Sequence, residues 1–201
     1  MGKNKRSFAL DSQFTVAGRY KRSIHLERDE LAVEALDGYQ LTPVALKSFS
    51  RVMLGLSGEE GSRAWSLTGP YGSGKSSFGM FLAALFAPKA AGKPSQEVSK
   101  IARRMLREMD VETHDAYFPR RGNSKLPDLR SILVTAERAP LAAILLRGLA
   151  TGLEQLWHGR RKPKLLEDVA KKAARAAAGK VPTTRVVVDL FERAVAEVNK
   201  S

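Results

Sequence analysis

Apolar positions recur at helical spacing along most of the chain. The clearest case is the range 42–56, whose predicted buried stripe consists of Leu46, Phe49, Val52, Met53 and Leu56. Thr42-Pro43 precedes this stripe and has the pattern of a capping residue followed by proline at the first helical position. The same spacing of three and four residues continues in 77–86, 95–107 and 140–157. Four amphipathic helices are therefore predicted.

Two short apolar runs have the composition of buried strands. They cover residues 64–68 and 131–135, and each is too short for a helix of ordinary length. Because helices are predicted between them, we expect the two runs to lie parallel in one sheet. The expected fold class is therefore α/β, a parallel sheet flanked by helices. Residues 110–130 are predicted to be irregular.

The last third of the chain is predicted to be rich in helix. Its alanine-rich range 165–178 favours a helix by composition. Residues 183–199 fit two structures. Three valines followed by Asp189 are typical of a strand that ends in a magnesium-coordinating carboxylate. A helix is favoured, because the range opens with a helix-start pattern and carries an apolar stripe of Val187, Leu190, Phe191, Ala194, Val195 and Val198.

The first apolar run leads directly into a glycine-rich loop. Its sequence is Gly69-Pro70-Tyr71-Gly72-Ser73-Gly74-Lys75-Ser76, a glycine, four free positions and then Gly-Lys-Ser. Glycines allow the backbone to curve closely around an anion, so that its N–H groups form a concave nest. The N-terminus of the next helix adds a partial positive charge at the same place. This stretch predicts a phosphate-binding loop for a nucleotide.

The chemistry of this loop gives each residue type an expected role. We expect Lys75 to reach the β- and γ-phosphates as a catalytic cation, and the Ser76 hydroxyl to be a ligand of Mg²⁺. Asp189 is the candidate for a catalytic carboxylate beside the magnesium ion, if its surroundings form a strand. The residues expected to contact bound ATP are Gly69, Pro70, Tyr71, Gly72, Ser73, Gly74, Lys75, Ser76 and Ser77.

The charge balance changes the expected partners. Lys and Arg number 34 against 21 Asp and Glu, so the net charge is +13. This excess favours an anionic partner, with nucleic acid first, although a basic protein without such a partner fits equally well. Arg103, Arg104 and Arg107 on the predicted helix 95–107 fit an anion-binding face, but an ordinary solvated face is the usual explanation. Cysteine is absent and no apolar run has the length of a membrane span, so we expect a cytoplasmic protein without a membrane partner.

The patterns divide the chain into three parts. Residues 1–41 form a basic N-terminal segment, 42–157 a nucleotide-binding core, and 158–201 a basic helical C-terminal segment.

The loop also carries a resemblance to known proteins. Gly69 to Ser76 resembles the Walker A motif of the P-loop NTPase superfamily. The longer run from Trp65 to Phe78 is similar to the N-terminal part of large bacterial AAA+-type ATPases, some of them from phage-defence or DNA-processing systems. Residues 20–27 and 39–43 are similar to segments of the same proteins.

This resemblance implies a P-loop fold, ATP hydrolysis, and action with nucleic acid or with a partner complex or oligomer. In those ATPases an apolar strand ending in Asp-Glu follows the region seen here, and no such strand follows in this chain. The resemblance therefore implies a truncated or split ATPase with an incomplete sheet. Such a chain is expected to bind ATP but to hydrolyse it slowly when alone.

Two other classes of function stay open. A small-molecule kinase fits the length of the chain, with Arg120, Arg121 and Arg130 as lid residues, but no substrate-binding acid is identifiable. A basic nucleic-acid adaptor, in which nucleotide acts only as a switch, fits the charge. ATPase assays with and without DNA separate these classes from a nucleic-acid-dependent ATPase.

Overall fold

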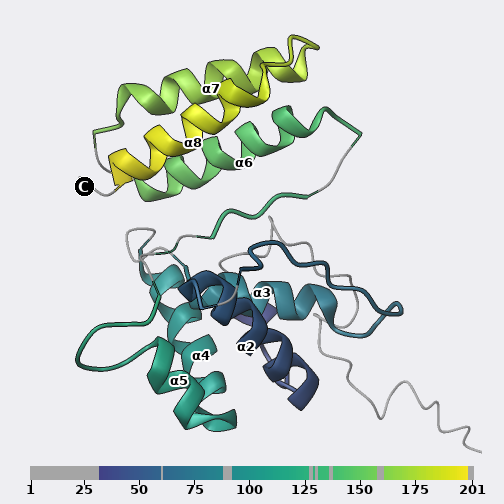
Figure 1. Ribbon diagram of the computed structural model, residues 1–201, viewed down its shortest axis with the longest axis vertical. Coiled ribbons are helices and arrows are strands. Elements are labelled where there is room, and N and C mark those ends of the chain that lie inside the picture. The colour runs from purple at the N-terminus through teal and green to yellow at the C-terminus, as the bar shows by residue number, and fades with distance from the viewer. Residues whose placement is uncertain are drawn as a thin grey trace, which may run out of the picture.

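A computed structural model describes residues 32–59, 61–87, 92–126, 129, 131–135, 138–157 and 161–198. This part of the chain is built from helices (Figure 1). They are η3 (Val33–Ala35), α2 (Pro43–Ser57), α3 (Lys75–Leu85), α4 (Lys93–Met109), α5 (Val111–Tyr117), α6 (Leu141–Leu156), α7 (Lys164–Ala177) and α8 (Thr184–Val198). Residues 1–31, most of the predicted basic N-terminal segment, lie outside the described residues.

The first helix group, η3 to α5, packs around aromatic side chains. Helix α2 begins as the sequence predicts: Pro43 is its first residue, and the Thr42 side chain accepts a hydrogen bond from the Ala45 backbone N–H at 3.2 Å. Phe49 of α2 and Phe81 of α3 are fully buried, and their ring centroids lie 6.1 Å apart in an edge-to-face arrangement. Burial of such rings dominates the energy of a core. The cluster therefore fixes α3, and with it the loop that opens α3, against α2.

Helix α5 corrects the prediction that residues 110–130 are irregular. Asp110 ends α4 and also caps α5. Its carboxylate accepts a hydrogen bond from the Thr113 backbone N–H at 2.9 Å and a second from the Thr113 hydroxyl at 2.7 Å. A capping carboxylate satisfies backbone donors that a helix start leaves open. The prediction was wrong over residues 111–117 because one side chain starts a second helix where the first ends.

Removing this cap gives a testable loss of stability. We expect Asp110→Ala to lower the free energy of unfolding by about 1 kcal/mol. Hydrogen bonds from Thr113 hold the pKa of Asp110 below its ordinary value. Because the folded-state pKa is the lower one, the cap stabilises above about pH 4 and its contribution is lost as the pH falls through the folded-state pKa.

Urea titrations between neutral pH and pH 3 would measure both effects. Asp110→Asn should keep most of the cap but lose this part of the pH dependence. The exposed Asp37→Ala is the matched control and should change stability by less than about 0.5 kcal/mol. Equal losses in Asp110→Ala and Asp37→Ala would show that the cap contributes nothing.

The second helix group consists of α6, α7 and α8, which run alternately in opposite directions side by side (Figure 1). Its core is mainly aliphatic, with Leu146, Val169 and Leu190 fully buried, one from each helix. This confirms the helical interpretation of 183–199 over the strand alternative. Helix α6, which the predicted boundaries place in the nucleotide-binding core, shares its buried side chains with α7 and α8.

Residues 131–135 form an extended segment that contacts both groups. Leu133 packs against the first cluster. The residues on either side of it, Ile132 and Val134, pack against α6. A β-carbon added at Gly148 of α6 would lie only 2.5 Å from a methyl carbon of Val134, and one added at Gly152 would lie 3.1 Å from Ile132. The absence of side chains at these two glycines therefore lets the extended segment approach the helix backbone.

The structure contradicts the predicted parallel α/β sheet. No residue in the described ranges is in a strand, and no ladder of backbone hydrogen bonds joins 64–68 to 131–135. A strand needs a neighbouring strand for its backbone N–H and C=O groups. Instead, 131–135 packs on α6, while the Trp65 indole lies against Gly55 of α2. Residues 131–135 thus pack on a helix, residues 64–68 stay exposed, and the fold class is helical.

Candidate functional site

The glycine-rich loop lies on the surface, between the exposed run 63–68 and the start of α3. Two of its glycines have a left-handed backbone, Gly72 with φ 79° and Gly74 with φ 81°. A residue with a side chain adopts this conformation only with strain. The Ser73 N–H donates to the Pro70 carbonyl at 3.4 Å and closes a turn between these positions. The sequence Gly-Ser-Gly-Lys thus bends the chain sharply into the helix.

Lys75, the first residue of α3, folds back over this loop. Its ammonium donates hydrogen bonds to the carbonyl oxygens of Gly69 at 2.9 Å and Pro70 at 2.7 Å, and to the Ser73 hydroxyl at 3.3 Å. These acceptors lie near both ends of the loop. The positive charge is therefore held within the curve of the loop rather than extended into solvent.

The N-terminus of α3 presents unsatisfied donors at the same place. Gly74 is the capping residue, and no side chain caps the helix. The first turn also contains no acidic residue. Backbone N–H groups at an uncapped helix start carry a partial positive charge that favours anions. The Ser76 side chain is exposed in this first turn and Ser77 is half-buried.

The structure does not bring Asp189 to the loop. This carboxylate lies on α8, which packs against α6 and α7, whereas the loop opens α3, which packs against α4 (Figure 1). Asp189 is exposed and forms an ion pair with Arg193 at 3.7 Å. The same arginine contacts Asp168 of α7 at 3.3 Å, so Asp189 belongs to a surface network that joins α7 and α8. Its geometry here fits an ion-pair role.

The loop residues from Gly69 to Ser77 are contiguous in the structure, as the sequence requires, and Lys75 adds contacts across them. In the described ranges no group of three or more His, Asp or Glu side chains is arranged to hold a metal ion. Of the two oxygen ligands expected from the sequence for a Mg²⁺ ion, Ser76 lies at the start of α3 and Asp189 lies on α8. None of the helices within the described ranges is both long and apolar enough to cross a membrane.

Comparisons with known proteins add no family to this picture. No family model matches the chain, and neither a curated protein nor a solved structure gives a significant match.

Proposed function

We propose that this protein binds ATP together with Mg²⁺, and that residues 69–76 hold the triphosphate. The observation that carries the proposal is the position of the Lys75 ammonium, which three hydrogen bonds hold within a glycine-rich loop at an uncapped helix start. A cation, backbone donors and a helix dipole meet at one exposed place. Each of these features favours phosphate oxygens, and together they favour a chain of phosphates over a single charge.

The proposal concerns binding rather than rapid hydrolysis. Hydrolysis of a nucleoside triphosphate requires a carboxylate near the magnesium shell and a group that orients the attacking water, in addition to the phosphate loop. The best carboxylate candidate from the sequence, Asp189, is paired with Arg193 on α8. ATP therefore acts here as a bound ligand whose turnover depends on groups from elsewhere, such as a partner or an oligomer.

The role of Ser76 gives a test of the magnesium part of this proposal. In the unaltered protein, Mg²⁺ should strengthen ATP binding, because the Ser76 hydroxyl would help to hold the ion and the ion would offset the charge of the phosphates. In Ser76→Ala this gain should fall by about threefold or more, which corresponds to roughly 0.7 kcal/mol. Titration of ATP by calorimetry, with Mg²⁺ and with EDTA, measures the gain directly.

Ser48→Ala is the control, since it removes a hydroxyl that bonds only within α2, to the Val44 carbonyl. It should leave the magnesium dependence unchanged. If Ser76→Ala keeps the full gain from Mg²⁺, the metal is not held by this residue. If the unaltered protein shows no binding of ATP under either condition, the proposed function itself is wrong.

A further inference from the structure

A second feature of the molecule gathers positive charge outside the loop. A pocket of about 420 Å³ lies at the junction of α4, α5 and the segment that follows α5. Four cations lie on one face of α4, at spacings of three and four residues, and Arg120 comes from the segment after α5. The α4 cations are Lys100, Arg103, Arg104 and Arg107. The fold therefore brings basic side chains from two parts of the chain to one cavity.

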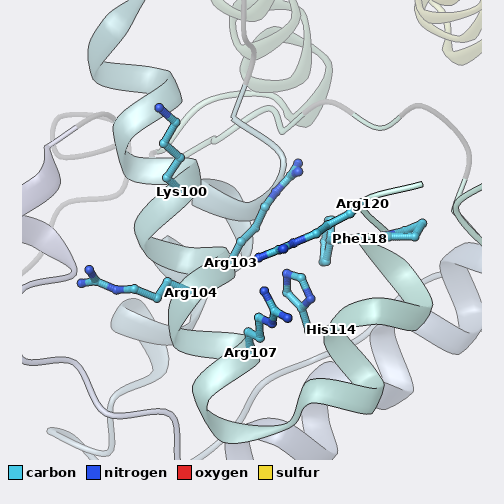
Figure 2. Close-up of a pocket in the computed structure, with 8 residues that line it drawn as sticks. Lys100, Arg103, Arg104, Arg107, His114, Phe118 and Arg120 are labelled. Carbon is cyan, nitrogen blue, oxygen red and sulfur yellow. The ribbon is translucent and has the colours of Figure 1, made fainter. Parts of the chain in front are cut away.

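Figure 2 shows how these side chains are directed. Arg107 and Arg120 lie close to His114, whereas Arg103 lines the same pocket with its guanidinium directed away from Arg107. Arg104 points away from this group and forms an ion pair with Glu108 at 3.7 Å. Several guanidinium groups lining one pocket repel one another unless an anion lies among them. The arrangement thus differs from a solvated helix face, where like charges spread apart.

Arg103 is held in place in a way that a solvated arginine is not. Its guanidinium carbon lies 4.7 Å from the centre of the Phe118 ring, and one terminal nitrogen donates to the Leu85 carbonyl at 3.4 Å. Its Nε atom is buried and has no hydrogen-bond partner within the described part of the chain. Burial also lowers the pKa of Arg103. A buried donor without an acceptor is costly, and an anion in the pocket would remove that cost.

The nearby carboxylates do not balance this charge. Asp115 is hydrogen-bonded to His114 at 2.6 Å, and this bond, with Arg107 and Arg120 nearby, lowers the pKa of Asp115. Glu108 is occupied by Arg104. Five lysine and arginine side chains line the pocket. With these two carboxylates counted against them, three positive charges remain in excess.

We propose that this pocket is a second anion site and that it binds phosphate groups. A phosphate oxygen can accept two parallel hydrogen bonds from a guanidinium, and arginine is the residue best suited to that geometry. A phosphate-bearing ligand carries enough charge to offset an excess of three positive charges, whereas a single carboxylate does not.

Two sources can supply such phosphates, a small diphosphate or the backbone of single-stranded nucleic acid. The test uses Lys75→Ala as the parent protein, so that the glycine-rich loop does not dominate binding. Inorganic pyrophosphate is titrated by calorimetry, and a labelled oligothymidylate of about 12 nucleotides is titrated by fluorescence anisotropy. The variant under test is Arg107→Gln with Arg120→Gln, which leaves Arg103 packed on Phe118.

We expect this pair of substitutions to weaken at least one of the two ligands by about fivefold or more. Loss for pyrophosphate with the oligonucleotide unchanged identifies a small phosphorylated ligand, and the reverse identifies a nucleic-acid backbone. The matched control is Lys171→Gln with Arg175→Gln, which removes the same charge from the exposed face of α7 and should change binding by less than about twofold.

Three outcomes overturn the proposal. The parent protein binds neither ligand, both affinities survive the pocket substitutions, or the α7 control loses as much affinity as the pocket variant. Circular dichroism of each variant confirms that the helices are retained, which we expect because Arg120 is exposed and Arg107 is only half-buried.

Discussion

Lys75→Ala should weaken the binding of ATP with Mg²⁺ by at least tenfold, about 1.4 kcal/mol. The substitution removes the cation that the loop holds between Gly69, Pro70 and Ser73. It also removes three hydrogen bonds that tie the loop to the start of α3. Charge-assisted hydrogen bonds to phosphate are among the strongest polar interactions available to a side chain. Isothermal titration calorimetry of the folded variant measures the loss.

The control for this substitution is Lys47→Ala, which removes one positive charge from the exposed face of α2. It should alter ATP affinity by less than about twofold, because a distant surface charge is screened by salt. A folded Lys75→Ala protein with unchanged affinity would rule out the loop as the triphosphate site. Equal losses in both variants would attribute ATP binding to net charge alone.

Phe81→Ala should lower the free energy of unfolding by about 3–5 kcal/mol, the range found when a large core side chain is truncated. The Phe81 ring is fully buried on α3 and lies about equally close to the rings of Tyr39, Phe49 and Phe78, with centroid distances of 6.0, 6.1 and 6.4 Å. Its removal leaves a cavity between helices from different parts of the chain. Those helices cannot all move inward to fill it, so the loss should lie well above that of an average substitution.

Urea unfolding followed by circular dichroism measures this loss, and tryptophan fluorescence locates it. Trp65 lies against α2 in the first helix group and Trp157 is buried in the second. In a Trp157→Phe background, the fluorescence transition therefore reports the first group. Leu141→Ala, at a position that is 70% exposed, is the control and should cost less than about 0.5 kcal/mol. A loss below about 1 kcal/mol in Phe81→Ala would show that the aromatic cluster does not hold α3 in place.

The helices were predictable from sequence because their signals are local. The stripe of α2, its Thr42 cap and the apolar face of α8 are set by residues within a few turns of one another. The cap of α5 is equally local, because Asp110 and Thr113 are three residues apart, and this spacing is a signal from which the helix could have been predicted. The sheet was a different kind of inference. The predicted sheet required residues 64–68 and 131–135, which are far apart in the sequence, to pair as strands. Short apolar runs do not specify whether they pair with a strand or pack on a helix.

The two candidate sites differ in the same way, since one is formed by contiguous residues and the other by separate segments of the chain. The loop from Gly69 to Ser76 is one contiguous stretch, so its residues could be named from sequence, and only the fold-back of Lys75 had to come from the structure. The basic pocket is assembled across a turn of the chain. From the sequence alone, Arg103 and Arg107 fit a solvated helix face. In the structure, His114 of α5 and Arg120 of the segment after α5 line the same pocket. Helical periodicity gives the face on which an arginine lies, but not what another helix places opposite it.

The two glycines of α6 have a consequence for local motion. Glycine weakens a helix interior by about 1 kcal/mol relative to alanine, so Gly148 and Gly152 make α6 a poorer helix in isolation than its leucines indicate. What offsets this is the extended segment 131–135, whose Ile132 and Val134 lie where the missing side chains would be. Helix and segment therefore protect each other's backbone amides. In hydrogen exchange, α6 and the segment 131–135 should open as one cooperative unit. Because Leu133 of that segment packs on the first cluster, opening of α6 should also lower the protection of amides in the first helix group.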